Sequence, residues 1–466
     1  MRGALEMEVR RGGSTPPGSV ATEFLPHAHP EAATTTKAVQ RTNPFSAVVK
    51  LCSLLPPGTT ERRDPRTKTD HEAMPRARRF CGRLGSMKSY DVLVVGGGMA
   101  GTSIAYELSV DRRVCVLEME DRLGFHTTGR SVATFLESYG GRTIRLLTTA
   151  SRDFLTTPEG LDRPLLSPLP LLWVAPHGEA NDLRALASAV QEFVTMQPLT
   201  PTEVNDIAPV FRPDWVEMGL SEPGASEIDV AALHELYATG IRRRGGELHL
   251  SAGVSAMRRV GDRWQVTDRA GNPYEAPVVV NASGAWADVV AAMAGVEPIG
   301  IHPLRRTVFT IAPPASINVP SLPLVAHVGE TFYFKPEGGH VLISPADETP
   351  SEPCDAKAEE LDIAQAIDVI NAATIFDVRS IRSSWAGLRS FVADRTPVAG
   401  FDDQADGFFW FVGQGGYGIQ IAPALAQAGA GLIRNGALPD RLTDLGLDAA
   451  ALGRERLVGL AWSAGH

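Results

Sequence analysis

Cysteine, long apolar runs and positive charge are all in short supply in this chain. Its four cysteines are Cys52, Cys81, Cys115 and Cys354. They are too few and too scattered for a disulfide framework or a zinc ribbon, and with no metal-ligand spacing in the sequence we expect no metal site and a reducing compartment. No run of 18 apolar residues occurs, which excludes a membrane-spanning helix. A net charge of −10 argues against general nucleic-acid binding.

What the chain does have is length and an average globular composition. Its 466 residues allow two or three domains, and 44% of them are hydrophobic. Residues 1–86 are different, because they contain nine prolines and 14 Lys/Arg against 8 Asp/Glu, a balance of +6, without a sustained apolar period. We predict that residues 1–86 form a disordered N-terminal extension and that the folded chain begins at Met87.

A dinucleotide-binding pattern opens this body. Residues 91–95 are a short β-branched apolar run typical of a buried parallel strand. The glycine-rich turn 96–101 follows, then a helical stretch at 102–109, a second strand at 114–117, and Glu118. This order of strand, turn, helix, strand and acid is the context that a G-x-G-x-x-G motif requires.

Each part of that pattern has a physical task. Gly96 allows the tight turn, Gly98 lets the backbone approach a pyrophosphate, and Gly101 lets the helix pack close to the strand. The helix N-terminus offers unpaired N–H groups to phosphate oxygens. Glu118 can accept ribose hydroxyls, and a carboxylate at this position disfavours the 2′-phosphate of NADP.

Two later segments favour FAD over NAD. The strand 277–281 runs into a turn of small residues that contains Gly284, and such a turn returns the chain to the cofactor. The strand 408–412 runs into the glycine-rich stretch 413–418, followed by a helix from Ile419. A second glycine-rich helix start indicates a second close backbone approach to the ligand. We therefore predict non-covalent FAD, because neither Cys115 nor Cys354 is clearly placed for attachment.

At this point the sequence resembles the FAD-dependent amine and D-amino-acid oxidoreductases, the family that includes glycine oxidase and sarcosine oxidase. Within it, the bacterial D-arginine dehydrogenases are most similar. The resemblance covers about residues 90–452 and none of the extension. The matching stretches are GGGMAG, GFHTTGRSVA, ASRDFL, PLLSP, LHELYATGIRRRGG, VNASGAWAD, FYFKPEGG, WAGLRSFVADRTPVAG and FFWFVGQGGYGIQ.

The resemblance implies a set of site residues. Those that would contact FAD are Gly96, Gly98, Ala100, Gly101, Glu118, Met119, Thr127, Thr128, Gly129, Ser131, Val132, Val254, Gly415, Gly416, Tyr417, Gly418, Ile419 and Gln420. Those that would contact the substrate are Tyr139, Arg306, Tyr333 and Arg389, with the Gly416 carbonyl taking the substrate amine. By the residues alone, Arg389 in its apolar stretch is either half of a structural ion pair or a clamp on a carboxylate.

Two positions depart from the D-arginine dehydrogenase pattern. Leu171 stands where a glutamate would bind the guanidinium, and Thr134 replaces a histidine. A buried cation needs a partner, so these changes predict a preference for neutral, apolar side chains. Glu137 is the nearest acid in the sequence that could restore a cation site.

The expected fold is α/β, a Rossmann-like FAD-binding domain interleaved with an α+β substrate domain on an antiparallel or mixed sheet. We assign 87–160, 246–300 and 386–466 to the FAD-binding domain, and 161–245 and 301–385 to the substrate domain. Within the latter, Thr200 and Glu203 form a capping-box pattern, and Asp229 can cap the helix that follows it.

The predicted activity is oxidation of the Cα–N bond of a D-amino acid, with the flavin carrying the chemistry and with quinone or oxygen as the electron acceptor. A cytoplasmic location is expected, with peripheral membrane association left open for electron delivery. Alternatives of the same fold are a sarcosine- or proline-like secondary-amine oxidase and a 2-hydroxy-acid dehydrogenase, although the latter needs a base that the sequence does not reveal. A non-catalytic flavin-binding assembly protein is the alternative of another class.

Overall fold

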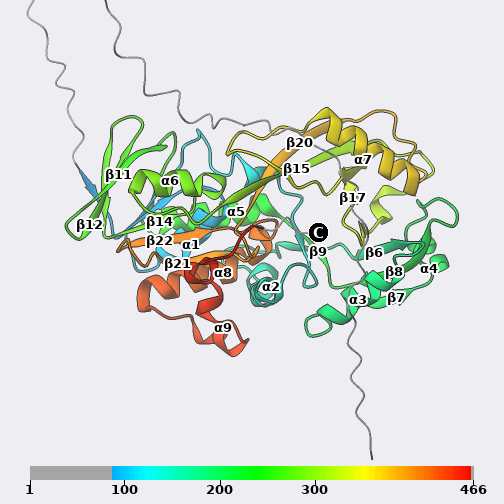
Figure 1. Ribbon diagram of the computed structural model, residues 1–466, viewed down its shortest axis with the longest axis horizontal. Coiled ribbons are helices and arrows are strands. Elements are labelled where there is room, and N and C mark those ends of the chain that lie inside the picture. Colours follow the sequence, from blue (N-terminus) through cyan, green and yellow to red (C-terminus); the bar gives the residue numbers. More distant parts are fainter. Residues whose placement is uncertain (1–86, 463–466) are drawn as a thin grey trace, which may run out of the picture. The chain divides into compact units, whose positions relative to one another are not determined.

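The computed structural model describes residues 87–462, so the prediction of a disordered extension lies outside the described residues. A six-stranded sheet in the order β10-β3-β2-β14-β22-β21 forms the first layer (Figure 1). All its neighbouring strands are parallel except β21 and β22. The bounds are β2 Val92–Val95, β3 Val114–Leu117, β10 Glu247–His249, β14 Val278–Asn281, β21 Val398–Phe401 and β22 Phe408–Val412.

This sheet is covered on both faces, and the side chains of one strand show why. In β2, Val92 and Val94 pack into one hydrophobic cluster with helices α1, α2, α5 and α8, whereas Leu93 and Val95 pack into another with α6 and the strands β11–β13. Successive strand residues point to opposite faces, so an unbroken apolar run suits a strand buried on both sides. The helices are α1 Met99–Leu108, α2 Arg142–Thr156, α5 Val230–Arg243, α6 Ala287–Ala294, α8 Gly418–Asn435 and α9 Asp440–Asp444.

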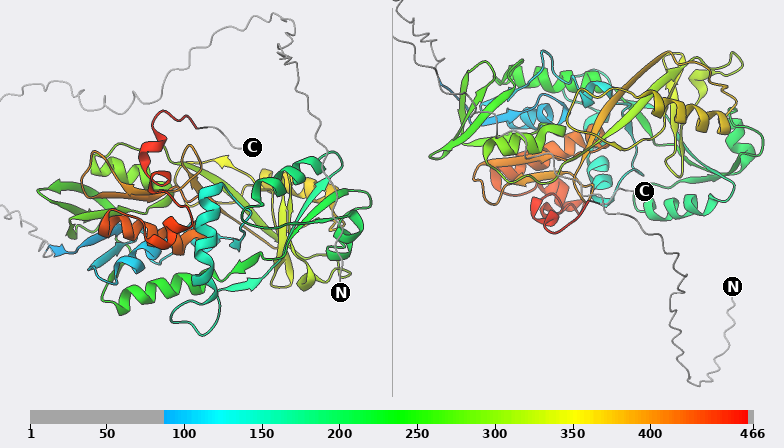
Figure 2. Two further views of the ribbon diagram at one scale, coloured as in Figure 1. Left: turned by 90° about the horizontal axis from the view of Figure 1, so that it is seen from below. Right: turned by 45° about the horizontal axis from the view of Figure 1, so that its top comes forward.

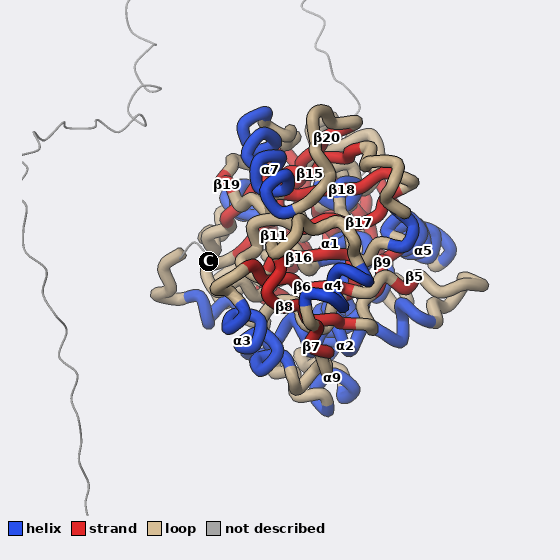
Figure 3. Tube along the Cα trace, turned by 90° about the vertical axis from the view of Figure 1, so that its right-hand side faces the viewer, coloured by secondary structure: helices blue, strands red, loops and turns tan. Residues whose placement is uncertain are grey.

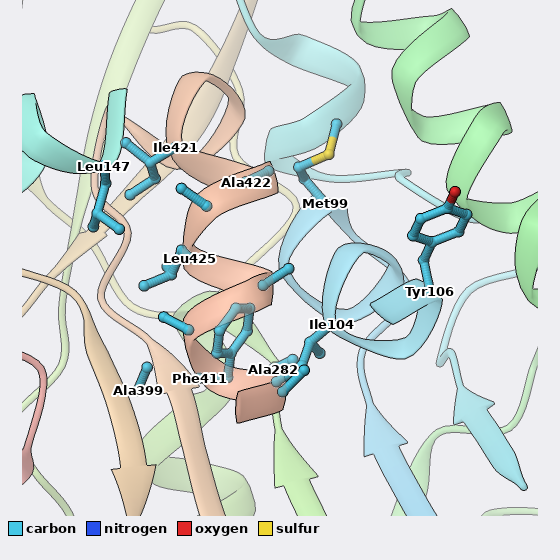
Figure 4. Close-up of a cluster of buried hydrophobic side chains, with 14 of the residues drawn as sticks. Met99, Ile104, Tyr106, Leu147, Ala282, Ala399, Phe411, Ile421, Ala422 and Leu425 are labelled. Atoms are coloured by element: carbon cyan, nitrogen blue, oxygen red, sulfur yellow. The ribbon is translucent and has the colours of Figure 1, made fainter. Parts of the chain in front are cut away.

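Helix α8 seals the core beside the glycine-rich turn. Figure 4 shows Ile421 and Leu425 of α8 on the side of Leu147 in α2, whereas Met99 and Ile104 of α1 lie on the other side of α8. Small side chains on α8 let α1 and α8 approach closely, and this packing joins the C-terminal segment to the first βαβ unit.

A four-stranded sheet in the order β1-β13-β12-β11 lies on the other face of the six-stranded sheet. Strands β12 and β13 form a hairpin around Gly271. The bounds are β1 Lys88–Ser89, β11 Val254–Val260, β12 Arg263–Asp268 and β13 Pro273–Ala276.

The second large layer is a nine-stranded mixed sheet in the order β19-β15-β18-β17-β16-β6-β8-β7, with β20 also paired to β15. Only β16 and β6 run parallel within it. Its strands are β6 Leu171–Pro176, β7 Gln197–Leu199, β8 Val216–Glu222, β15 His302–Ile311, β16 Leu324–His327, β17 Tyr333–Glu337, β18 His340–Ser344, β19 Thr349–Pro350 and β20 Ser383–Phe391. This fold confirms the α/β prediction with its mixed substrate-side sheet.

Helices α3 Ala180–Val190, α4 Pro201–Ile207 and α7 Glu360–Ala373 lie around this sheet (Figure 3). The capping box at Thr200 is present, because its hydroxyl accepts the Glu203 N–H and the Glu203 carboxylate accepts the Thr200 N–H. Asp229 caps α5 by accepting the Ala232 N–H at 2.9 Å.

A three-stranded antiparallel sheet, β4-β9-β5, completes the strands, with bounds β4 Thr134–Phe135, β5 Leu166–Pro168 and β9 Ser226–Ile228. The short 3-10 helices are η2 Thr127–Arg130, η3 Gly284–Trp286, η4 Val319–Ser321, η5 Ala449–Ala451 and η6 Arg454–Leu457. Figure 2 shows the six-stranded and nine-stranded sheets toward opposite ends of the described part.

The predicted domain limits remain predictions, but two elements pack with a different sheet from the one these limits assign to them. Helix α5, expected with the substrate domain, packs into the cluster that covers the six-stranded sheet, because its apolar face meets Tyr106 of α1. Strand β20 begins before residue 386 and pairs along its whole length with β15, so its residues 386–391, expected with the cofactor side, belong to the large sheet. The chain therefore changes sheets after Phe391 rather than at residue 386.

Candidate functional site

A single cavity of about 380 Å³ extends from the carboxyl ends of β2, β3, β14 and β22 to the nine-stranded sheet. The register pairs Val95 with Leu117 and with Asn281, so these strands end at one edge of the sheet. Ligands of open α/β sheets bind in the crevice outside such strand ends.

Most of the predicted cofactor residues line this cavity. They are Gly96, Gly98, Ala100, Glu118, Met119, Thr127, Thr128, Ser131, Val132, Val254, Gly284, Gly415, Gly416, Gly418, Ile419 and Gln420. Three others do not line it: Gly101, Gly129 and Tyr417. Tyr417 instead packs its ring against Tyr139, with the ring centroids 5.0 Å apart.

The first glycine-rich turn has the geometry that the motif predicts. A Cβ at Gly101 would overlap the carbonyl oxygen of Gly96, so only glycine lets α1 lie this close to the turn. Helix α1 begins at Met99, and its N-cap Gly98 provides no side-chain cap. The N-terminus faces the cavity, and although the Met99 N–H donates to the Thr128 hydroxyl, the N–H groups of the next residues are available for a phosphate.

Glu118 directly follows β3 and is 7% exposed. Its carboxylate accepts the N–H of Gly97 at 2.6 Å and the N–H of Glu120 at 2.9 Å. These two bonds orient the carboxylate beside the glycine-rich turn at the cavity wall, where the ribose acceptor was predicted.

The second glycine-rich segment forms a matching approach. Helix α8 begins at Gly418, and its N-cap Tyr417 makes no side-chain cap. The amide nitrogen of Gln414, which lines the same stretch of the cavity, is buried without a hydrogen-bond partner. Two helix N-termini at the cavity and an unpaired buried side-chain amide donor suit an anionic, polar ligand such as a dinucleotide, so the residues present fit FAD.

The hydroxyl-rich segment between these turns forms hydrogen bonds to helix α1 and to strand β20. Thr128 accepts the Met99 N–H at 2.9 Å, while Thr127 donates to the carbonyl of Leu388 at 2.7 Å. Arg130, which sequence reasoning did not single out, donates to the carbonyls of Ala356 and Ala386 and pairs with Asp355. This segment therefore connects the cofactor side of the cavity to strand β20.

At the other end of the cavity, Arg389 of β20 is 8% exposed and lies between Tyr139 and Gly416. Its Nη2 donates to the Tyr139 hydroxyl at 2.7 Å, and a Cβ at Gly416 would overlap that guanidinium. Burial alone would lower the pKa of Arg389, but the facing tyrosines and a carboxylate raise it above its ordinary value. The guanidinium is thus buried, charged and directed at the cavity.

Arg306 of β15 is 9% exposed and lines the cavity beside Arg389. Its Nε donates to the carbonyl of Asp347 at 2.8 Å. Both arginines also contact Glu348, at 3.5 Å from Arg306 and 3.1 Å from Arg389. Sequence reasoning missed Glu348, because only the pairing of β15 with β19 and β20 brings residue 348 to these arginines.

The wall next to the arginines is apolar. Leu171 is fully buried in β6 and lines the cavity with Trp173 and Leu324. Thr134 of β4 and Tyr333 of β17 line the same region. All seven predicted substrate residues therefore border one cavity: Thr134, Tyr139, Leu171, Arg306, Tyr333, Arg389 and Gly416. Their roles remain predictions.

Two acids near this region differ in placement. Glu137, the sequence candidate for a cation partner, pairs with Arg152 at 2.5 Å and does not line the cavity. Glu330, which sequence reasoning missed, lines the cavity from the exposed turn between β16 and β17. His327 also borders the cavity, and burial lowers its pKa. Of these two acids, only Glu330 borders the cavity.

A metal-binding cluster and a membrane-spanning helix are both absent from the described residues. Among residues 87–462, no group of three or more His, Cys, Asp or Glu side chains is placed to hold a metal ion. No helix in this part of the chain is long and apolar enough to cross a membrane.

Several known proteins are similar in sequence to this chain. The chain is 24% identical to glycine oxidase of Geobacillus kaustophilus over 371 residues, which is 74% of this chain and 93% of the relative. It is also 24% identical to mitochondrial dimethylglycine dehydrogenase of Rattus norvegicus, over 55% of this chain but only 30% of that protein.

Solved structures share the fold. The glycine oxidase of Geobacillus kaustophilus superposes with a TM-score of 0.67 at 22% identity, covering 81% of this chain and all of that chain. L-proline dehydrogenase from P. horikoshii superposes with a TM-score of 0.65 at 20% identity, covering 80% of this chain and 98% of that chain. The profile of the family described as DAO, FAD dependent oxidoreductase, matches residues 91–432. The chain therefore belongs to this FAD-dependent oxidoreductase family, with FAD as its cofactor.

Proposed function

We propose that this protein oxidises the Cα–N bond of a D-amino acid with a neutral, apolar side chain. Loss of a hydride from Cα and of a proton from nitrogen gives an imino acid, which water converts to a 2-oxo acid and ammonia. FAD, when bound, supplies the two-electron acceptor for that hydride. The observation that carries the proposal is the buried pair Arg306 and Arg389 beside the Leu171 wall in the cofactor cavity.

The chain's own residues would position the substrate. Arg389 and Arg306 would hold the α-carboxylate through charge-assisted hydrogen bonds, with Tyr139 and Tyr333 as additional donors. The Gly416 carbonyl would accept a hydrogen bond from the neutral amine. For hydride transfer, the side chains need only orient the substrate in this way and exclude water.

Side-chain preference would follow from the apolar wall next to the arginines. Leu171, Trp173 and Leu324 present no charge, so a buried guanidinium or ammonium would be left unpaired there. Glu137 is occupied by Arg152, and Glu330 lies in an exposed turn where water screens it. These placements support neutral substrates over D-arginine or D-lysine.

A secondary amine is the second candidate substrate. The relative named sarcosine dehydrogenase and the structural neighbour named L-proline dehydrogenase favour it, because sarcosine and proline are secondary amines. A carboxylate clamp would serve these substrates equally well, because all of them share the α-carboxylate.

The deciding experiment is an anaerobic panel in which bleaching of the oxidised flavin is followed for each substrate. D-leucine, D-methionine and D-phenylalanine should bleach it faster than D-arginine, L-amino acids, sarcosine or 2-hydroxy acids. Faster bleaching by sarcosine or proline would establish the second candidate instead. A bound flavin that none of these compounds bleaches would indicate a non-catalytic assembly protein. Reoxidation by oxygen or by a soluble quinone would then identify the electron acceptor.

A further inference from the structure

One carboxylate oxygen in the structure serves three arginines. Oε1 of Glu348 lies 3.5 Å from Nη2 of Arg306, 3.1 Å from Nη1 of Arg389 and 2.6 Å from Nη2 of Arg395. The Glu348 side chain is 24% exposed, whereas Arg306 and Arg389 are almost fully buried. Three positive charges therefore meet one negative charge at the end of the cavity.

The four residues do not have equal access to the cavity. Arg306 and Arg389 line the cavity, whereas Glu348 and Arg395 do not. Arg395 is held in place by the Phe391 ring, with its guanidinium carbon 4.0 Å from the ring centroid. Burial tends to lower the pKa of Arg395, but its bond to Glu348 holds that pKa above the ordinary value. Arg395 thus stays charged and binds Glu348 without lining the cavity.

This arrangement makes Glu348 a competitor for the guanidinium groups. Nη1 of Arg389 already donates to Glu348 and Nη2 donates to Tyr139, so a carboxylate arriving from the cavity meets a guanidinium that is partly neutralised. A like charge close behind an anion site weakens anion binding, and in a partly buried site it is only partly screened. Arg395 opposes that effect, because its positive charge also binds the Glu348 carboxylate.

We propose that Glu348 controls how tightly the site binds a carboxylate, and that Arg395 partly offsets the effect of Glu348. Glu348 lowers the affinity of Arg389 and Arg306 for the substrate's carboxylate, and Arg395 limits that reduction. The consequence is a site that releases a 2-oxo acid product as well as binding an amino acid. This inference rests on the proposed function, because it takes Arg389 and Arg306 as the carboxylate clamp.

The two residues make opposite predictions when changed singly. Glu348→Gln removes the competing charge but keeps an oxygen that accepts from the arginines, so acetate and propionate should bind about tenfold more tightly. Arg395→Gln leaves Glu348 to the two cavity arginines, so the same anions should bind more weakly by a similar factor. The double variant Glu348→Gln/Arg395→Gln restores the original net charge, and its affinity should return close to that of the parent protein.

The measurement uses the purified holoprotein and needs no turnover. Acetate or propionate is titrated while the visible spectrum of the bound flavin is recorded, and the dissociation constant is obtained for each variant. The increase in melting temperature at a fixed anion concentration gives a second, independent ranking. Glu352→Gln is the matched control, because it removes the same charge from a nearby exposed position and makes no contact with these arginines.

The outcomes separate this inference from the proposed function. Weaker anion binding in both single variants would show that the pair is merely structural, and unchanged binding in both would also overturn the inference. If D-amino acids bleach the flavin in the parent but Glu348→Gln does not bind anions more tightly, only the inference fails. If neither amino acids nor simple carboxylates affect the flavin of the parent, the clamp and the inference are both wrong. If Glu348→Gln fails to fold, the anion affinity of Arg395→Gln still tests the inference. Weaker binding would support it, and unchanged or tighter binding would overturn it.

Discussion

The two ends of the cavity are built by different means. At the cofactor end, backbone groups of two glycine-rich turns and two helix N-termini face the cavity, and each comes from a short contiguous segment. At the substrate end, side chains from strands β4, β6, β15, β17 and β20 converge across long distances in the sequence. The first end tolerates few sequence changes, because close backbone approaches require glycine, while the second can change its specificity through single side chains.

The sharpest test of this contrast is Gly101→Ala at the cofactor end. The added Cβ would overlap the Gly96 carbonyl, so α1 must move away from the turn. We expect destabilisation of about 3 kcal/mol and loss of bound FAD, measured by thermal unfolding and by flavin absorbance. Gly224→Ala is the control, because nothing lies within 4 Å of its added Cβ. A Gly101→Ala protein with full flavin content would contradict the close approach.

At the substrate end, Arg389→Met should separate the two regions. We expect FAD to stay bound while the apparent affinity for the amino acid falls by about 2–5 kcal/mol, because the carboxylate loses a charged partner. Steady-state KM and flavin content measure the two effects. Arg379→Met, at a side chain that is 82% exposed, serves as the control. An unchanged affinity would assign Arg389 a structural role and move the clamp to Arg306.

Specificity should respond to the wall residue Leu171. Leu171→Glu places a carboxylate at a fully buried cavity position, so the ratio of kcat/KM for D-arginine to that for D-leucine should rise by about tenfold or more. Leu171→Gln has nearly the same shape without the charge and should change the ratio far less. A parent protein that already prefers D-arginine would refute the apolar wall and direct attention to Glu330.

The smallest expected effect concerns the segment that carries Tyr139. Glu222 is 1% exposed and accepts the Ser138 hydroxyl at 2.5 Å and the Glu137 N–H at 3.2 Å. Burial raises its pKa, although these donors oppose the shift. The folded protein therefore holds this proton more tightly than the unfolded chain, and the free energy of unfolding falls as the pH rises through the raised pKa.

Glu222→Gln should remove that pH dependence. Between pH 4 and 8 we expect the variant to gain about 1 kcal/mol relative to the parent, measured by denaturant unfolding at each pH. Glu159→Gln, at an exposed position, is the control. A parallel pH dependence in parent and Glu222→Gln proteins would mean that another group titrates.

Sequence patterns predicted the local structure well, and the reason is visible in particular residues. The run from Val92 to Gly101 specifies a buried strand, a turn and a helix within ten residues, because chain neighbours supply the needed contacts. The caps at Thr200 and Asp229 are equally local and were confirmed. The limit at residue 386 crosses strand β20, because the partner of that strand, β15, lies some 80 residues earlier.

By itself the sequence determined the βαβ unit, both glycine-rich approaches and, through its resemblance to a family, which side chains to examine at the substrate end. Only the tertiary structure decided that Glu348 binds three arginines, that Glu137 is occupied by Arg152, and that Glu330 borders the cavity. The physical reason is that a motif acts through backbone geometry over a few residues, whereas the electrostatics of a pocket depends on which charges long-range strand pairing brings together.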